Sequence, residues 1–277
     1  MVTLPLLAAI ETLLLGKVKV LCFGDFDQLP CINNSWRGQS VDSRVFQHSR
    51  LMKSWCDCTI FRMTGVNFRR CDKAHFDYYC QIPAMDLGTA VAEARTRYPS
   101  TPTHADWNLT ISHHRRMQLN ANLQEAATRA YKASGGTSIV RIDPEEEDEE
   151  ETARKKRRIC KNRAQAYDLW PGTRLIGATS ETKHIVNGAL LDVMAVSNDE
   201  EIKVTLKDIE TNVEFTLTPE QVAKHTRLRW AVTYPAIQGR TLDGTVRLWD
   251  ADSKHFTIEA LYVGLSRAKD GSKVSVV

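Results

Sequence analysis

The amino-terminal part of the chain carries apolar residues at helical spacing. These residues are Leu6, Leu7, Ile10, Leu13 and Leu14. Thr3 is a suitable N-cap and Gly16 a suitable stop, so the pattern predicts a helix over 3–15. An apolar run over 18–23 then predicts a buried strand, which ends at Gly24. A helix, a strand and a polar loop in this order are typical of an α/β sheet with a site at the strand's carboxyl end.

A second helical pattern covers 115–132. Its apolar side is formed by Leu119, Leu123, Ala126, Ala127 and Ala130. Near the carboxyl end, the pattern predicts a strand over 245–249, a helix over 257–267 and a last strand over 273–277. The chain therefore returns to α/β character after its middle section.

Between these α/β parts, short β-rich stretches alternate with turn-forming residues. The stretches are 173–178, 190–197, 202–208 and 213–217. Asn187-Gly188 and Asn198-Asp199 have the chemistry of tight turns between strands. We predict a small β-barrel over 164–224, inserted in an α/β domain.

Two opposite blocks of charge interrupt the chain. Residues 145–151 are all acidic, and residues 154–158 are all basic. Neither block can bury an apolar face, so we predict a disordered linker over 134–163. The interpretation of the basic block stays open. It is either a nuclear-import signal, which would place the protein in the nucleus, or a segment that contacts phosphate. Alternatively, the two charged blocks form one solvated linker whose halves partly neutralise each other.

The composition is that of a globular protein without a strong bulk charge. Of 277 residues, 42% are apolar and 26% charged, and the net charge is +3. A nucleic-acid site would therefore need a local basic groove. Seven cysteines without a secretory signal favour reduced thiols. A zinc cluster is the alternative for one group of residues, but its spacing fits no paired pattern, and we predict no metal site in this chain. That group is Cys56, Cys58, Cys71, His75 and Cys80. No apolar run reaches the roughly 20 residues that span a membrane, so we expect no membrane partner.

Several short motifs combine glycine, glutamine and arginine in ways that suit phosphate. Gln28, in the loop after the strand over 18–23, has an amide that can donate to a phosphate oxygen. Arg69 follows an aromatic residue, and a guanidinium binds phosphate in a bidentate way. Arg267 ends the helix over 257–267, where it either balances the helix dipole or stabilises a transferring phosphoryl group. Taken singly, each motif also has an ordinary structural explanation.

The order of these motifs resembles the PIF/RecD-like branch of superfamily 1 DNA helicases. In sequence they are G-D-x-x-Q-L-P over 24–30, F-R over 68–69, N-G over 187–188, Q-G-x-T over 238–241, and Y-V-x-L-S-R-A over 262–268. The resemblance extends from the first helix to residue 268. It implies an α/β fold of RecA-like parallel-sheet domains with an inserted small β-barrel, acting as an ATP-dependent helicase on single-stranded and duplex DNA.

The resemblance also implies a role for each motif residue. Gln28, Arg69 and Arg267 would act on the γ-phosphate of ATP. The nucleotide cleft would be lined by Gly24, Asp25, Gln238 and Gly239. The single strand would be contacted by Thr233, Thr241, His113 and Arg116. The expected divisions are a remnant of the first RecA-like domain over 1–64, a second domain over 65–133 and 225–277, the linker over 134–163, and the barrel over 164–224.

This chain departs from the family pattern in several places. Pro235-Ala236-Ile237 stands where the family has His-Lys-Ser, so a cation is lost before Gln238. No G-x-x-x-x-G-K-[ST] loop and no acidic Mg²⁺-binding pair occurs. We therefore expect that ATP and Mg²⁺ are held by a missing upstream segment or a partner chain, and that this chain alone hydrolyses no ATP. The alternative is an inactive module that only binds nucleic acid or docks on a partner.

Overall fold

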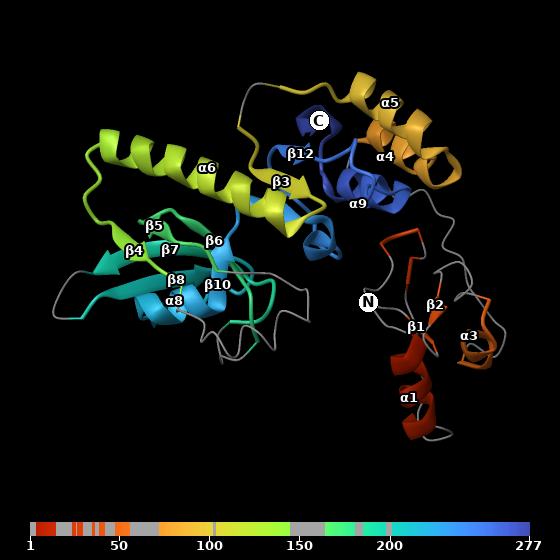
Figure 1. Ribbon diagram of the computed structural model, residues 1–277, viewed down its shortest axis with the longest axis horizontal. Coiled ribbons are helices and arrows are strands. Elements are labelled where there is room, and N and C mark those ends of the chain that lie inside the picture. The colour runs from red at the N-terminus through yellow and green to blue at the C-terminus, as the bar shows by residue number, and fades with distance from the viewer. Residues whose placement is uncertain are drawn as a thin grey trace.

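A computed structural model describes most of the chain (Figure 1). The described residues are 4–14, 24–25, 27–29, 35–36, 39–41, 48–55, 72–101, 104–144, 164–180, 185–197 and 201–277. The strand expected over 18–23, Arg69 and both charge blocks lie outside them. None of the described helices is long and apolar enough to cross a membrane.

A four-stranded parallel sheet forms the centre of the larger part of the molecule. Its order is β11 (Ala231–Thr233), β3 (Trp107–Thr110), β12 (Val246–Leu248) and β13 (Val274–Val276). All three pairings are parallel. The sheet thus takes one strand from before the antiparallel section of the chain and three from after it. The strands are short and buried on both sides, as expected for a parallel sheet.

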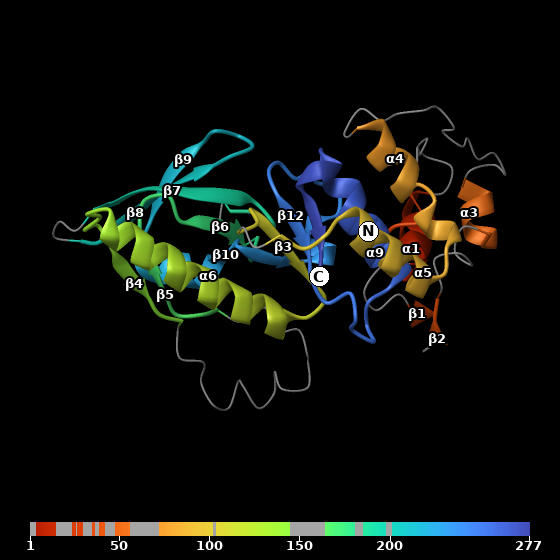
Figure 2. The ribbon, with the colours of Figure 1, turned by 90° about the horizontal axis from the view of Figure 1, so that it is seen from above.

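Helices flank this sheet, and three of them, α4, α5 and α9, form one hydrophobic core with it. They are α4 (Lys73–Tyr79), α5 (Leu87–Arg97), α6 (His113–Ala133) and α9 (Ile258–Arg267), with short 3₁₀ turns at Ile82–Ala84, Tyr234–Ile237 and Gly271–Lys273. Figures 1 and 2 show α4, α5 and α9 together beside the sheet, with α6 extending away from it. The prediction of a helix over 257–267 is confirmed. Thr257 is the N-cap, and α9 begins at the next residue.

The antiparallel section forms a second core. Its main sheet has the order β10 (Thr226–Leu228), β6 (Arg174–Gly177), β7 (Leu190–Ser197), β8 (Lys203–Asp208) and β9 (Glu214–Leu217). We call it the five-stranded sheet. A separate pair joins β4 (Val140–Ile142) to β5 (Tyr167–Leu169), and α8 (Pro219–His225) packs nearby. The described strands leave β9 and β10 as edges, so closure into a barrel stays a prediction.

The structure corrects two expected boundaries. The linker was expected to begin at residue 134, but β4 lies within that range and pairs with β5. The barrel section was expected to end at residue 224, but β10, at 226–228, pairs with β6. Charge density could not identify a three-residue strand whose partner lies more than twenty residues further along the chain.

The face that α6 buries is polar, which corrects the sequence analysis. The most buried residues are Arg116, Asn120, Gln124 and Thr128, at four-residue spacing. The alanines and leucines that were expected to form the buried side are half-buried or exposed. Asn120 donates to the Ala231 carbonyl and accepts from Ala231 N, at 3.1 and 2.8 Å. The helix therefore covers the free edge of β11 with hydrogen bonds rather than with apolar contacts.

The amino-terminal elements form a small lobe of their own (Figure 1). They are α1 (Leu4–Leu14), β1 (Ser35–Trp36), β2 (Gln39–Ser40) and α3 (Arg50–Trp55). The helix expected over 3–15 is thus confirmed as α1. It packs against β1 and α3, where Leu7 and Met52 are buried.

Candidate nucleic-acid site

A pocket of about 320 Å³ lies beside the carboxyl ends of two neighbouring parallel strands. β3 ends at Thr110 and leads into α6, and β11 ends at Thr233 and leads into the turn over 234–237. The other wall comes from the five-stranded sheet. The lining residues are His113, Arg116, Ile176, Gly177, Asn187, Gly188, Val232, Thr233, Pro235, Ala236, Gln238 and Arg240. The pocket therefore lies between the two cores, at the edge where α/β proteins commonly bind ligands.

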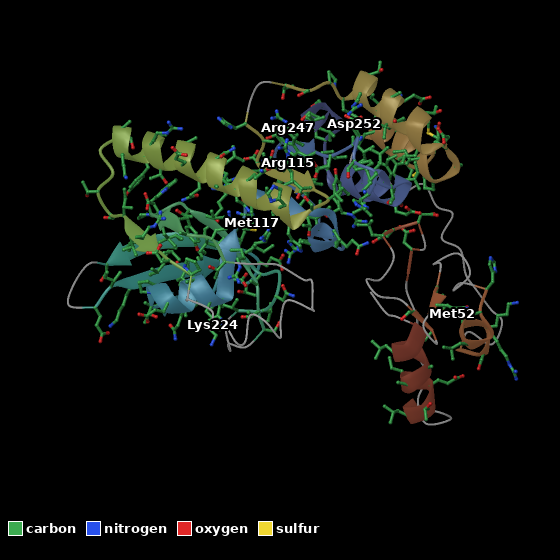
Figure 3. The ribbon with its side chains drawn as sticks, in the orientation of Figure 1. Met52, Arg115, Met117, Lys224, Arg247 and Asp252 are labelled. Carbon is green, nitrogen blue, oxygen red and sulfur yellow. The ribbon has the colours of Figure 1, made fainter. Side chains whose placement is uncertain are left out.

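Residues that are distant in sequence meet in this pocket. Three of the four expected DNA contacts, His113, Arg116 and Thr233, line it together with Gln238. Thr241 does not line it. Figure 3 shows how α6 reaches both cores: Arg115 lies beside the parallel sheet and Met117 toward the five-stranded sheet. Met117 O accepts a hydrogen bond from Gln165 Nε2, which lies just before β5.

The pocket is electropositive, because its lining contains arginines and a histidine but no acidic residue. Burial, together with the nearby Arg227 cation, lowers the pKa of Arg116 to about 10. Burial and Arg116 also lower the pKa of His113. Both shifts mean that burial and a neighbouring cation disfavour positive charge here, so an anion entering the pocket would offset that cost.

Two buried polar atoms of the lining residues also point to a ligand. Among the described residues, none hydrogen-bonds to Nδ1 of His113 or Oε1 of Gln238. A buried polar atom without a partner costs free energy, and such atoms often mark a site that a ligand or water completes. Apolar side chains, such as Ile176 from the five-stranded sheet and Pro235 from the turn after β11, also line the pocket. This combination of cations, polar atoms and apolar surface suits a nucleotide of a single strand.

The loop that carries Gln28 is tied to the larger part of the molecule. Asp25 accepts hydrogen bonds from Gln28 Nε2 at 3.0 Å and from Tyr262 O–H of α9 at 3.1 Å. Gln238 Nε2 donates to the Leu29 carbonyl at 3.2 Å. Burial and Asp25 raise the pKa of Tyr262, so its hydroxyl stays protonated and remains a donor. Gln238 thus touches both the loop over 24–29 and the pocket.

The remaining predicted site residues are placed as follows. Gly24 is exposed, and Gly239 adopts φ +81° in the turn between Gln238 and Arg240. Arg267 is 5% exposed at the end of α9, and its carbonyl accepts from Leu242 N. Arg69 lies outside the described residues. The convergence of Gln28, Arg69 and Arg267 on one cleft therefore stays a prediction.

His75, one of the five candidate zinc ligands, is already engaged in other contacts. Both ring nitrogens of His75 are engaged, with Tyr98 Oη at 2.7 Å and the Leu265 carbonyl at 3.0 Å. Cys80 is exposed, and Cys56, Cys58 and Cys71 lie outside the described residues. Within the described part of the chain, no three His, Cys, Asp or Glu residues gather as metal ligands, so these residues do not fit a Mg²⁺ site.

Sequence reasoning missed Arg240 as a pocket residue. The loss of a cation at 235–237 made contact with DNA at this point doubtful, yet Arg240 places a guanidinium in the same pocket. The sequence signal was available, since Arg240 lies inside the Q-G-x-T motif. The direction of the Arg240 side chain depends on the turn at Gly239, which has a positive φ. The spacing of residues in the sequence does not predict that turn.

The parallel sheet with its helices and the antiparallel second core define a mixed α/β protein. The chain shares its fold with a Pif1 helicase from Candida albicans, with a TM-score of 0.58 and 16% identity, over 92% of this chain and 63% of that one. A double mutant of Bacteroides Pif1 helicase matches with a TM-score of 0.50 and 18% identity, over 100% of this chain and 68% of that one. No family model and no curated protein matches the sequence. The chain thus spans about 63% of the length of the Candida albicans protein.

Proposed function

We propose that this chain belongs to the Pif1-like helicases and forms the part of the motor that grips single-stranded DNA. The basic pocket between the parallel and five-stranded sheets carries this proposal. It gathers three residues that the family resemblance implied as DNA contacts. The shared fold supports the same conclusion.

The residues of this chain suggest how strand binding and the nucleotide site communicate. Gln238 lines the pocket and also holds the loop over 24–29 through the Leu29 carbonyl. That loop carries Gln28, which we propose as the sensor of the ATP γ-phosphate. When bound, ATP supplies the free energy for movement along DNA. The hydrogen bonds of Gln238 and Tyr262 would transmit a shift of the loop to the DNA pocket.

A binding module without ATPase activity is the second candidate. It is favoured by the sequence, which contains no G-x-x-x-x-G-K-[ST] loop. In both cases the chain alone should bind single-stranded DNA and hydrolyse no ATP. DNA-stimulated hydrolysis that returns when an upstream segment or partner supplies the loop would identify the motor. Continued inactivity with intact strand binding would identify the binding module.

The first prediction concerns strand binding. Thr233→Val removes a hydroxyl from the pocket and His113→Leu removes an imidazole, each with little change in size. Each should weaken binding of a labelled oligo-dT, and a hydrogen bond lost to a charged phosphate corresponds to roughly tenfold. Fluorescence anisotropy measures the Kd. His255→Leu, at an exposed position outside the pocket, is the matched control. Equal affinities of all four proteins would contradict a DNA site here.

A further inference from the structure

Arg240 forms a bridge from the pocket to the five-stranded sheet. Its Nη1 donates to Glu210 Oε1 at 2.7 Å, and its Nη2 donates to the Gly188 carbonyl. Glu210 lies in the turn between β8 and β9, and Gly188 lies in the turn before β7. The side chain of Arg240 is 21% exposed and that of Glu210 is 64% exposed. The cation is therefore half-enclosed, while its carboxylate partner faces solvent.

The acceptors of this bridge are held by fixed turns. Gly188 adopts φ +91°, and a Cβ there would lie 3.1 Å from Arg240 Nη2. Only glycine therefore permits both the turn and the close approach of the guanidinium. In the other turn, Asp208 accepts from Glu210 N at 2.8 Å and from Thr211 N at 3.0 Å. An ordered turn therefore holds the backbone of Glu210 in place. Most exposed ion pairs instead join two side chains that must both be ordered to meet.

The charges around Arg240 favour exchange of its partner. Arg240 lines the same pocket as Arg116 and His113, whose lining contains no carboxylate. A phosphodiester entering the pocket would interact with all three groups, whereas Glu210 interacts only with the one at the rim. A guanidinium forms the same forked hydrogen bonds with phosphate as with carboxylate. Phosphate and Glu210 would therefore compete for Arg240.

We propose that Glu210 acts as an internal substitute for phosphate, which holds Arg240 in the DNA-free protein and yields it to a phosphodiester of the bound strand. This inference rests on the proposed function, because it takes the pocket as the DNA site. Exchange would release the Glu210 arm of the bridge, while the Gly188 carbonyl remains an acceptor for Arg240. Glu210 would then set the affinity for single strands.

A double-mutant cycle on the full chain tests the exchange. Glu210→Gln should tighten oligo-dT binding by roughly two- to fivefold, the strength of an exposed ion pair. Arg240→Gln should weaken binding and reduce the slope of log K against log salt by about 0.7, the value for one phosphate on a single strand. In the Arg240→Gln background, Glu210→Gln should have no further effect.

The control and the contrary outcomes separate this inference from the proposed function. Asp252 lies on the parallel-sheet side of the molecule (Figure 3). Asp252→Asn breaks its ion pair with Arg95 and should leave binding unchanged. If the wild type binds single strands but Glu210→Gln does not tighten binding, or tightens it equally without Arg240, the exchange is wrong. If the wild type binds no single strand, the proposed function itself is wrong. Thermal unfolding of each variant checks that the fold is kept.

Discussion

At the scale of single residues, buried polar side chains organise this protein more than its apolar pattern suggests. His75 is 2% exposed, with its ring between Tyr98 and the backbone of α9. The helix that carries it is capped by Asp72, which also accepts from Gly271 N at 3.1 Å. Each such contact joins segments that are far apart in sequence, so the loss of one side chain loosens two elements.

His75 predicts a specific dependence of stability on pH. Burial lowers its pKa below the ordinary value of 6.5, so the folded protein keeps the ring neutral. As pH falls through the unfolded-state pKa, the unfolded chain takes up a proton that the folded chain does not. The free energy of unfolding should therefore decrease between pH 7.5 and 5. Asp72 stays ionised there, because its pKa is lowered.

Urea unfolding at several pH values measures this effect. His75→Gln keeps polar groups for Tyr98 and Leu265 but does not titrate, so it should flatten the pH dependence. His255→Gln removes an exposed histidine and serves as the control. An unchanged slope in His75→Gln would show that other groups cause the acid sensitivity.

At the scale of elements, α6 holds the two cores together. Asn120 bonds to β11 of the parallel sheet, and Gln124 donates to the Asp168 carbonyl in β5 at 2.6 Å. Trp230 Nε1, beside β11, in turn donates to Gln124 Oε1 at 2.6 Å. One helix face thus satisfies backbone groups of both cores, and it also supplies Arg116 to the pocket.

Replacing Asn120 should reveal this role. Asn120→Leu leaves the buried N–H and carbonyl of Ala231 without their side-chain partners, which costs about 2–4 kcal/mol for two unsatisfied groups. Chemical denaturation measures the loss. Asn122→Ala, on the exposed face of the same helix, should change stability by about 0.5 kcal/mol or less. A similar small change for Asn120→Leu would mean that the edge of β11 needs no cover.

At the scale of the whole molecule, the charged segment stands in the sequence between two adjacent strands. Ile142 of β4 pairs with Tyr167 of β5 in an antiparallel ladder, so the chain must leave and return at neighbouring points. A connection of about two residues can join such strands. The segment over 145–158 is therefore not needed to span a distance.

Deleting 145–158 should leave the fold intact. The remaining residues over 143–144 and 159–166 still suffice to join β4 to β5, and the removed charges bury no apolar surface. The melting temperature should stay within about 2 °C of the wild type, since a change of 1 kcal/mol corresponds to roughly 2–4 °C at this size. A larger drop would show that the segment packs against the protein. Reduced DNA affinity with unchanged stability would instead show that its basic half contacts phosphate.

The sequence by itself determined the elements that have strong local signals. The helix at 4–14, α9 and the strands β6 to β9 follow from periodicity, caps and turn residues, all of which act between near neighbours. Local signals missed β3, β4, β5 and β10, whose partners in the sheets lie far along the chain. They also assigned the wrong buried face to α6. Its polar side chains are buried because they find hydrogen-bond partners in the two sheets, which the local pattern does not reveal.

The family resemblance determined which residues were candidates for the site, and only the tertiary structure decided which of them meet. Thr233 shares a pocket with His113 and Arg116 because β3 and β11 are adjacent and parallel, although more than a hundred residues separate Thr233 from the other two. Arg240 joins them because a turn at positive φ redirects its side chain toward Gly188 and Glu210. Strand pairing and turn geometry are properties of the folded chain, and no spacing within the sequence encodes the distances they create.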